Sequence, residues 1–137
     1  IYFNPAPMNK AVLNYPLNLI DTFIVNQIEA MTLTNANTTE QILTKMAELF
    51  PESKILLTLG QDGVIYQDKD QQIKQPGFKA EAIDTTAAGD TFLGYYIASL
   101  QKKIDIKKAL ETACRAAAMA VTRAGAACSI PYIKELT

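Results

Sequence analysis

The sequence predicts an α/β fold built on a mostly parallel sheet with an antiparallel hairpin at one edge. Short apolar runs rich in β-branched and aromatic residues alternate with segments of helical periodicity, which is the order of βαβ units. The composition agrees with this class, because 49% of the 137 residues are hydrophobic and 20% are charged, as in one globular domain with an apolar core.

Each predicted element has a local signal. Pro51 closes the first long helix, and Asp105 is a candidate N-cap of the last one. After Gly60, a polar turn separates two short strand-like runs, which predicts the edge hairpin. In chain order, we expect strands over 1–4 and 21–25 with helical material from about Met8 between them, a helix over 38–50, a strand over 54–59, a hairpin made of 64–66, the turn 67–71 and Ile73, and helices over 92–100 and 106–121.

Composition also narrows the function classes. A net charge of −1 and a pI near 5.4 leave no basic patch for nucleic acid and no polybasic segment for a membrane. No apolar run reaches the roughly 18 residues of a spanning helix, and residues 1–5 lack signal-peptide features, so we expect a cytoplasmic protein with Cys114 and Cys128 as free thiols. The absence of histidine leaves acid–base chemistry to carboxylates.

The most informative stretch is residues 84–92, where two aspartates and several small residues precede an apolar helical segment. Small residues and the free N–H groups of a helix start can hold a phosphate, so Ala87, Ala88 and Gly89 are candidates for an anion hole. Asp90 beside them is a candidate general base that takes a proton from an attacking hydroxyl during phosphoryl transfer. The alternative is a helix N-terminus capped by Thr or Asp, without catalysis.

Two further motifs follow predicted strands, at the sheet edge where open α/β folds bind ligands. Asn26 and Glu29 could hold a hydrated Mg²⁺ against nucleotide phosphates, or they could form a helix capping box. The glycines of residues 58–63 would let a nucleotide approach the backbone, although Asp62-Gly63 is also a sufficient hairpin turn.

Five motifs in the same order resemble the ribokinase-like carbohydrate kinase family, whose signature is Asp-Thr-x-Gly/Ala-Ala-Gly-Asp-x-Phe. The resemblance implies a doubly wound sheet and ATP-dependent phosphorylation of a sugar hydroxyl. The matching motifs are Asn4-Pro5-Ala6-Pro7, Asn26-x-x-Glu29, Thr58-Leu59-Gly60-x-x-Gly63, residues 84–92, and Val121-Thr122-Arg123-x-Gly125-Ala126-x-x-Ser129-Ile130-Pro131.

The resemblance also implies site roles. Asp90 would be the base and contact the sugar, and Asn26 and Glu29 would organise Mg²⁺ indirectly. Cys114 stands where relatives often carry a histidine beside the purine, so it departs from the pattern. Nucleotide-binding positions would be Asn26, Thr58, Leu59, Gly60, Gln61, Asp62, Gly63, Gly89 and Cys114. Ligands of a K⁺ ion would be Asp84, Thr86, Ala120, Arg123, Gly125 and Ser129, unless this loop is only a glycine C-cap and turn.

Because members of the family run to roughly twice this length, we expect residues 1–137 to be the C-terminal, nucleotide-binding portion of one domain, without the N-terminal sugar-binding and lid half. Its small-molecule partners would be ATP and a sugar, with D-ribose the first candidate and fructose, a keto-deoxy sugar acid or a nucleoside as alternatives. The full-length protein would be a homodimer. A third reading is a non-catalytic nucleotide-binding fragment, and the chain alone is expected to be inactive.

Overall fold

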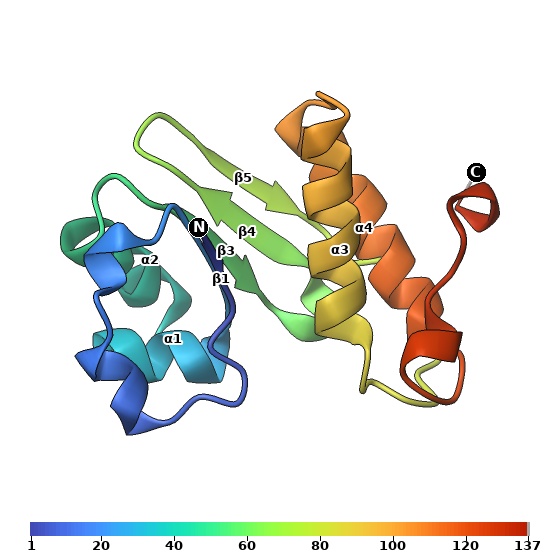
Figure 1. Ribbon diagram of the computed structural model, residues 1–137, viewed down its shortest axis with the longest axis horizontal. Helices are drawn as coiled ribbons and strands as arrows, with labels where there is room; N and C mark the ends of the chain where they lie inside the picture. Colours follow the sequence, from blue (N-terminus) through green and yellow to red (C-terminus); the bar gives the residue numbers. More distant parts are fainter. Residues whose placement is uncertain (137) are drawn as a thin grey trace. The chain divides into compact units, whose positions relative to one another are not determined.

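The computed structural model describes residues 1–136, which contain five strands and four α-helices (Figure 1). They divide into two compact units, one made of residues 1–60 and 64–74 and the other of residues 61–63 and 75 onward. The strands are β1 (Tyr2–Phe3), β2 (Thr22–Asn26), β3 (Lys54–Thr58), β4 (Val64–Gln67) and β5 (Gln72–Gln75). The α-helices are α1 (Gln27–Thr34), α2 (Thr39–Leu49), α3 (Ala88–Gln101) and α4 (Ile106–Ala120).

The strands form one sheet in the order β1-β2-β3-β4-β5. β1, β2 and β3 are parallel neighbours, whereas β4 runs antiparallel to β3. The predicted hairpin is present, and its turn is closed by Asp68, whose carboxylate accepts the backbone N–H groups of Asp70 and Gln71 at 2.8 Å. The register places Asn26 opposite Thr58, so the carboxyl ends of the parallel strands β2 and β3 lie side by side.

Helices α1 and α2 cover one face of the sheet in the first unit (Figure 1). Both begin at side-chain caps, since Asn26 accepts the N–H of Glu29 at 2.9 Å and Thr38 accepts that of Gln41 at 3.3 Å. The helical spacing predicts one apolar side made of Ile42, Leu43, Met46 and Leu49. The first three point into the core, whereas Leu49 in the last turn of α2 is 54% exposed. The other core residues are Val12, Phe23, Val25, Ala30, Leu33, Ala36, Ile55, Leu57 and Ile65.

Strands β2, β3 and β4 are buried on both faces. Ile24, Leu56 and Tyr66 alternate with the residues of the core beneath α1 and α2 and are themselves at most 3% exposed. This explains why these strands are nearly continuous apolar runs rather than alternating ones.

The second unit is built on α3 and α4, which pack against each other. Asp105 caps α4 by accepting the N–H of Lys108 at 3.1 Å, as predicted. The small residues of α4 let the helices approach closely, and α3 supplies the large side chains Phe92 and Tyr96, whose rings stack at 6.2 Å. Within residues 1–136, no helix is long and apolar enough to cross a membrane.

Several element boundaries differ from the prediction. Helix α3 begins at Ala88 rather than Phe92, because the small residues join the helix, and Asp90 therefore lies in its first turn. The helical material after Met8 is only two short 3-10 segments, Lys10–Asn14 and Leu17–Leu19. The first ends before Pro16, whose ring disfavours a helical residue ahead of it. β3 ends at Thr58, one residue early.

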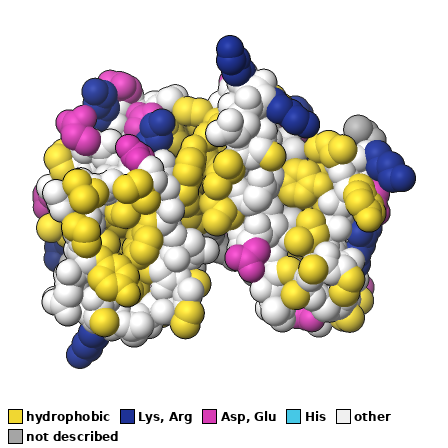
Figure 2. All heavy atoms as spheres, viewed as in Figure 1, with side chains coloured by type: hydrophobic (Ala, Val, Ile, Leu, Met, Phe, Trp, Pro, Cys, Tyr) yellow, Lys and Arg dark blue, Asp and Glu magenta, His cyan; other side chains and the backbone are white. Residues whose placement is uncertain are grey.

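The sheet ends at β1, and apolar residues there reach the surface. Ile1 is 64% and Tyr2 43% exposed, beside a sheet edge with no further strand among the described residues. Hydrophobic side chains gather on the visible surface of the first unit, which contains β1 (Figure 2). The sheet edge at β1 therefore carries exposed apolar side chains.

Candidate active site

The start of α3 has open backbone donors. Its N-cap residue is Ala87, which has no side chain that could accept a hydrogen bond, whereas α1, α2 and α4 all begin at Asn, Thr or Asp caps. Ala88 donates its N–H to the carbonyl of Thr85 at 3.2 Å. Among the described residues, no acceptor faces the N–H groups of Ala87, Gly89 and Asp90. The Thr or Asp cap considered from the sequence is therefore not formed, and an anion can take its place.

Asp90 is the third residue of α3 and is exposed. In residues 1–136, its carboxylate has no hydrogen-bond or ion-pair partner. The free oxygens can accept a proton from a substrate hydroxyl. The neighbouring Gly89 has open space where a Cβ would stand, so the approach to these donors is clear.

Asp84 joins two backbone segments next to α3. One oxygen accepts the N–H of Thr86 at 2.9 Å and its hydroxyl at 2.5 Å, and the other accepts the N–H of Gly125 at 3.0 Å. These bonds, first the Thr86 hydroxyl and then the two N–H groups, lower the pKa of the carboxyl below its usual value. The backbone N–H groups of Ile83 and Asp84 also donate to the carbonyl of Val121, at 2.7 and 3.1 Å. Asp84 thus holds the loop after α4 against the segment before α3.

The loop after α4 carries the predicted cation ligands. The carbonyl of Ala120 accepts the N–H of Arg123 at 3.0 Å, and the hydroxyl of the buried Ser129 donates to the carbonyl of Ala126 at 2.7 Å. Together with Asp84, the loop offers oxygen donors and one negative charge, which suits K⁺. Among the six predicted ligands, hydrogen bonds join Asp84 to Thr86 and Gly125, and Ala120 to Arg123, whereas Ser129 bonds to Ala126. K⁺ binding stays a prediction.

In the first unit, Asn26 and Glu29 form a reciprocal capping box. Asn26 accepts the N–H of Glu29, and one carboxylate oxygen of Glu29 accepts the N–H of Asn26, both at 2.9 Å. The second Glu29 oxygen has no partner among the described residues, so a water of hydrated Mg²⁺ could still bind there. The capping alternative is thus realised without removing the predicted metal role.

The predicted nucleotide loop has one glycine in open space and one in a tight site. Gly60 has a φ of +60° and no atom within 4 Å of an added Cβ. Gly63 has a φ of +99°, and an added Cβ would lie 2.1 Å from the carbonyl oxygen of Gln75. Residues 60–62 form a 3-10 turn between them. The loop thus passes close to the backbone of residues 75–77 at Gly63.

The two cysteines differ in environment. Cys114 is buried in α4, and burial raises the pKa of its thiol to about 12, which keeps it protonated at neutral pH. Little of its surface is exposed, so its predicted contact with adenine would be small. Cys128 is exposed and also free. Both observations agree with the assignment of free thiols.

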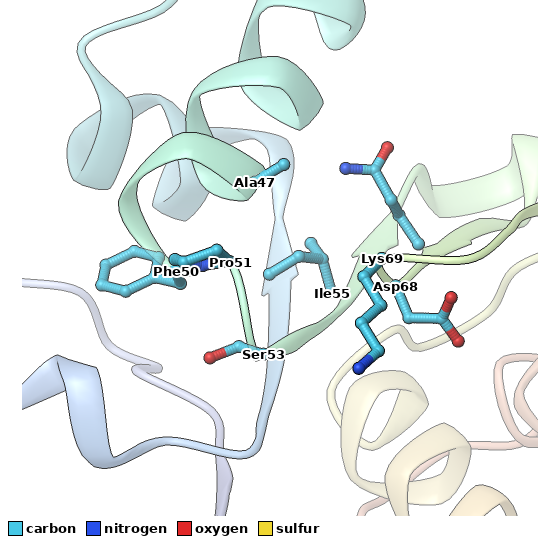
Figure 3. Close-up of a pocket in the computed structure, with 8 residues that line it drawn as sticks. Ala47, Phe50, Pro51, Ser53, Ile55, Asp68 and Lys69 are labelled. Atoms are coloured by element: carbon cyan, nitrogen blue, oxygen red, sulfur yellow. The ribbon is translucent and has the colours of Figure 1, made fainter.

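Two hollows in the first unit lie away from the predicted site. A cavity of about 30 Å³, with room for one water, lies between the end of α2 and the β4–β5 hairpin (Figure 3). A more open hollow of about 460 Å³ lies beside α2. Neither is lined by a predicted site residue. The small cavity is lined by Ala47, Phe50, Pro51, Ser53, Ile55, Gln67, Asp68 and Lys69, and the larger by Thr39, Glu40, Leu43, Thr44, Ile65, Gln67, Gln72 and Lys74.

Comparison with known proteins identifies the family. The sequence profile of the pfkB family carbohydrate kinases matches residues 1–132. The chain belongs to this family. The pfkB chain is 38% identical over 138 residues to a ribokinase from Staphylococcus aureus, a match that covers 97% of this chain and 45% of that protein. It therefore spans about half the length of the curated relatives that it matches.

Solved structures agree with the α/β fold that the sequence predicts for this pfkB chain. A ribokinase from Cryptococcus neoformans in complex with ADP has a TM-score of 0.85 at 26% identity, covering 98% of this chain and 49% of that one. A putative ribokinase II from E. coli, in complex with ATP and Mg²⁺, has a TM-score of 0.85 at 27% identity, with 99% and 46% covered. A fructokinase double mutant from Vibrio cholerae, bound to fructose, ADP and potassium, has a TM-score of 0.84 at 26% identity, with 98% and 48% covered.

Sequence reasoning missed the residues that hold the loop after α4 of this pfkB chain. Arg123 pairs with Glu135 at 2.6 Å, and the hydroxyl of Tyr95 donates to the carbonyl of Pro131 at 2.5 Å. The partners are 12 and 36 residues apart and follow no helical or strand period. No signal in a single sequence could have paired them.

Thr91, next to Asp90, has a buried hydroxyl whose effect on the stability of the fold can be tested. It is 2% exposed, and its hydroxyl is the one buried side-chain polar atom without a partner in residues 1–136. Because an unpaired buried hydroxyl opposes folding, Thr91→Val is expected to raise the free energy of unfolding by about 1 kcal/mol in urea titrations. Thr34→Val is the control, because its buried hydroxyl donates to the carbonyl of Ala30 at 2.7 Å and its loss should destabilise. Equal destabilisation by both variants would contradict the prediction.

The bonds to Asp84 predict a pH dependence. Since folding lowers its pKa, ionised Asp84 stabilises the native state above its usual value near 3.8, and this contribution is lost as the pH falls through the lower native value. Asp84→Asn is therefore expected to melt at a lower temperature than the wild type at pH 7, and the difference should disappear once the pH lies below the lowered native pKa of Asp84. A difference of equal size at both pH values would show that the charge of Asp84 is not involved.

Proposed function

We propose that the protein carrying this chain transfers the γ-phosphoryl group of ATP to the 5-hydroxyl of D-ribose, which gives D-ribose 5-phosphate and ADP. Residues 1–137 would be the nucleotide-binding portion of a single ribokinase-like domain and would be inactive alone. Ribose is preferred as acceptor because the pfkB relative at 38% identity is a ribokinase. The whole enzyme's activity is proposed from relatives of which this chain matches about 45%.

The open start of α3 is the observation that carries this proposal. Three N–H groups without acceptors, at the positive end of a 14-residue helix, are suited to a phosphoryl group that gains charge in the transition state. Asp90 in the same turn is exposed and unpaired, so it can take the proton of the sugar hydroxyl as the phosphoryl group leaves ATP. Phosphoryl transfer needs little more from a protein than this positioning and charge stabilisation.

The residues present also fit the ions that the proposal requires. Mg²⁺ would be held through water by Glu29 and Asn26 and, when bound, neutralises the nucleotide phosphates. K⁺ would bind among Asp84 and the carbonyl and hydroxyl oxygens of the loop after α4. The E. coli structure with ATP and Mg²⁺ and the V. cholerae structure with potassium support these choices.

A calorimetric titration of the 137-residue chain with ADP and Mg²⁺, in K⁺ and in Na⁺, tests the nucleotide half of the proposal. Saturable binding that K⁺ strengthens is expected. Absence of binding by a chain that melts cooperatively would refute a self-sufficient nucleotide site. A panel of D-ribose, fructose, a keto-deoxy sugar acid and a nucleoside, tested with the complete enzyme, separates ribose from the other acceptors.

A further inference from the structure

We propose that Glu135 is a positioning residue: the C-terminal tail, residues 130–136, holds the loop of residues 121–129 in the shape that a monovalent cation needs. This inference rests on the proposed function, because the loop is the proposed K⁺ site. It assigns to the tail a role that the kinase motifs do not contain. The tail would set how much K⁺ the nucleotide site requires.

The carboxylate of Glu135 makes two bonds, one to the 121–129 loop and one to the tail itself. One carboxylate oxygen pairs with the Arg123 guanidinium at 2.6 Å, and the other accepts the backbone N–H of Tyr132 at 2.6 Å. The Glu135 N–H in turn donates to the carbonyl of Tyr132 at 2.9 Å. Glu135 therefore ties the 121–129 loop to a turn of the tail.

A second contact fastens the tail to α3. The hydroxyl of Tyr95, two turns along α3, donates to the carbonyl of Pro131 at 2.5 Å. Pro131 itself is buried, and Leu136 at the end of the tail is 8% exposed. The tail is thus anchored on both sides of Glu135. Because the tail is fixed in this way, the ion pair with Glu135 can keep Arg123 in one position.

At its other side the same loop is held by Asp84. Gly125, two residues after Arg123, donates to Asp84, and Val121, two residues before Arg123, accepts from Ile83 and Asp84. The contacts form a closed chain from Tyr95 of α3 through the tail to Arg123, Gly125 and Asp84, and back to the start of α3. Loss of one member would loosen the loop without unfolding either helix.

Charge gives Glu135 a second effect on a cation. The carbonyl of Arg123 is a proposed K⁺ ligand, while its guanidinium carries a positive charge that opposes K⁺. Glu135 neutralises this charge and holds it in one place. Because the side chains of the pair are 36% and 31% exposed, solvent screens the effect, and a change of about threefold to tenfold is expected.

The test compares Glu135→Gln with Glu111→Gln in the 137-residue chain. Glu111 pairs with Lys108 at 2.9 Å and with Arg115 at 3.2 Å on α4 and is 32% exposed, so the control loses two ion pairs outside the loop. ADP and Mg²⁺ are titrated at increasing K⁺ with constant total ionic strength. The readout is the K⁺ concentration that gives half of the maximal gain in ADP affinity. We expect E135Q to raise it about threefold to tenfold, E111Q to leave it unchanged, and ADP affinity at saturating K⁺ to be equal in all three.

The outcomes separate the two proposals. If the wild type binds ADP with a K⁺ response and E135Q responds like E111Q, the positioning role is wrong and the proposed function stands. If ADP binding by E135Q stays weak at saturating K⁺, its role is general stability and the inference fails. If the wild type shows no K⁺ response, the proposed cation site is wrong and this inference falls with it.

The charge-swapped double variant R123E/E135R is used if E135Q folds poorly. A half-maximal K⁺ concentration near that of the wild type supports the role of the ion pair, and a raised concentration overturns it.

Discussion

Replacement of Asp90 by asparagine is expected to lower kcat of the complete enzyme by about 10²- to 10⁴-fold, with ADP affinity nearly unchanged. The amide has the shape of the carboxylate but cannot take the proton of the sugar hydroxyl. Asp90 has no partner among the described residues, so the substitution breaks no contact of the fold. Steady-state kinetics of the enzyme and ADP titration of residues 1–137 measure the two quantities separately.

Asp105→Asn is the matched control for Asp90→Asn. It also removes one negative charge at a helix start, but asparagine can still cap α4. We expect normal turnover and a small change in melting temperature. If Asp90→Asn keeps full turnover and only lowers the melting temperature, as the loss of a favourable charge near the helix dipole would, Asp90 stabilises α3 and another group is the base.

Gly63→Ala is expected to destabilise the chain by about 2–5 kcal/mol. With a φ of +99°, residue 63 is in a conformation that residues with a side chain rarely adopt. The added methyl would also lie 2.1 Å from the Gln75 carbonyl oxygen and 2.5 Å from the Gly77 nitrogen, both of which are backbone atoms. Relief requires the chain to move, so the conformational and steric costs add. Urea unfolding measures the loss.

Gly60→Ala separates the two causes. Gly60 also has a positive φ, but an added Cβ would have no atom within 4 Å, so only the conformational cost of about 1–2 kcal/mol remains. If the two variants unfold at the same urea concentration, the close approach at Gly63 is relieved at no cost and the prediction is wrong.

Much of the fold could be predicted because its signals are local. The Asp105 cap and the Asn26–Glu29 box are bonds between residues three apart, which the sequence displays directly. The apolar runs of β2 and β3 are long enough to indicate strands buried on both faces. The prediction was less accurate for the segment after Met8, where the expected helical material consists of two short 3-10 segments.

In the candidate site, too, some features follow from the sequence and others only from the tertiary structure. By itself, the sequence determined the order of the motifs, the small residues before α3 and the position of Asp90, and these features indicate the chemistry of the pfkB family. Only the tertiary structure decided that α3 begins at Ala88 without a side-chain cap. It also decided that the Asp84 carboxylate accepts hydrogen bonds from Thr86 and Gly125 and does not cap a helix. It also decided the pairing of Arg123 with Glu135. The physical reason is that contacts between distant loops depend on how packed helices place those loops, and no periodicity in the chain records that placement.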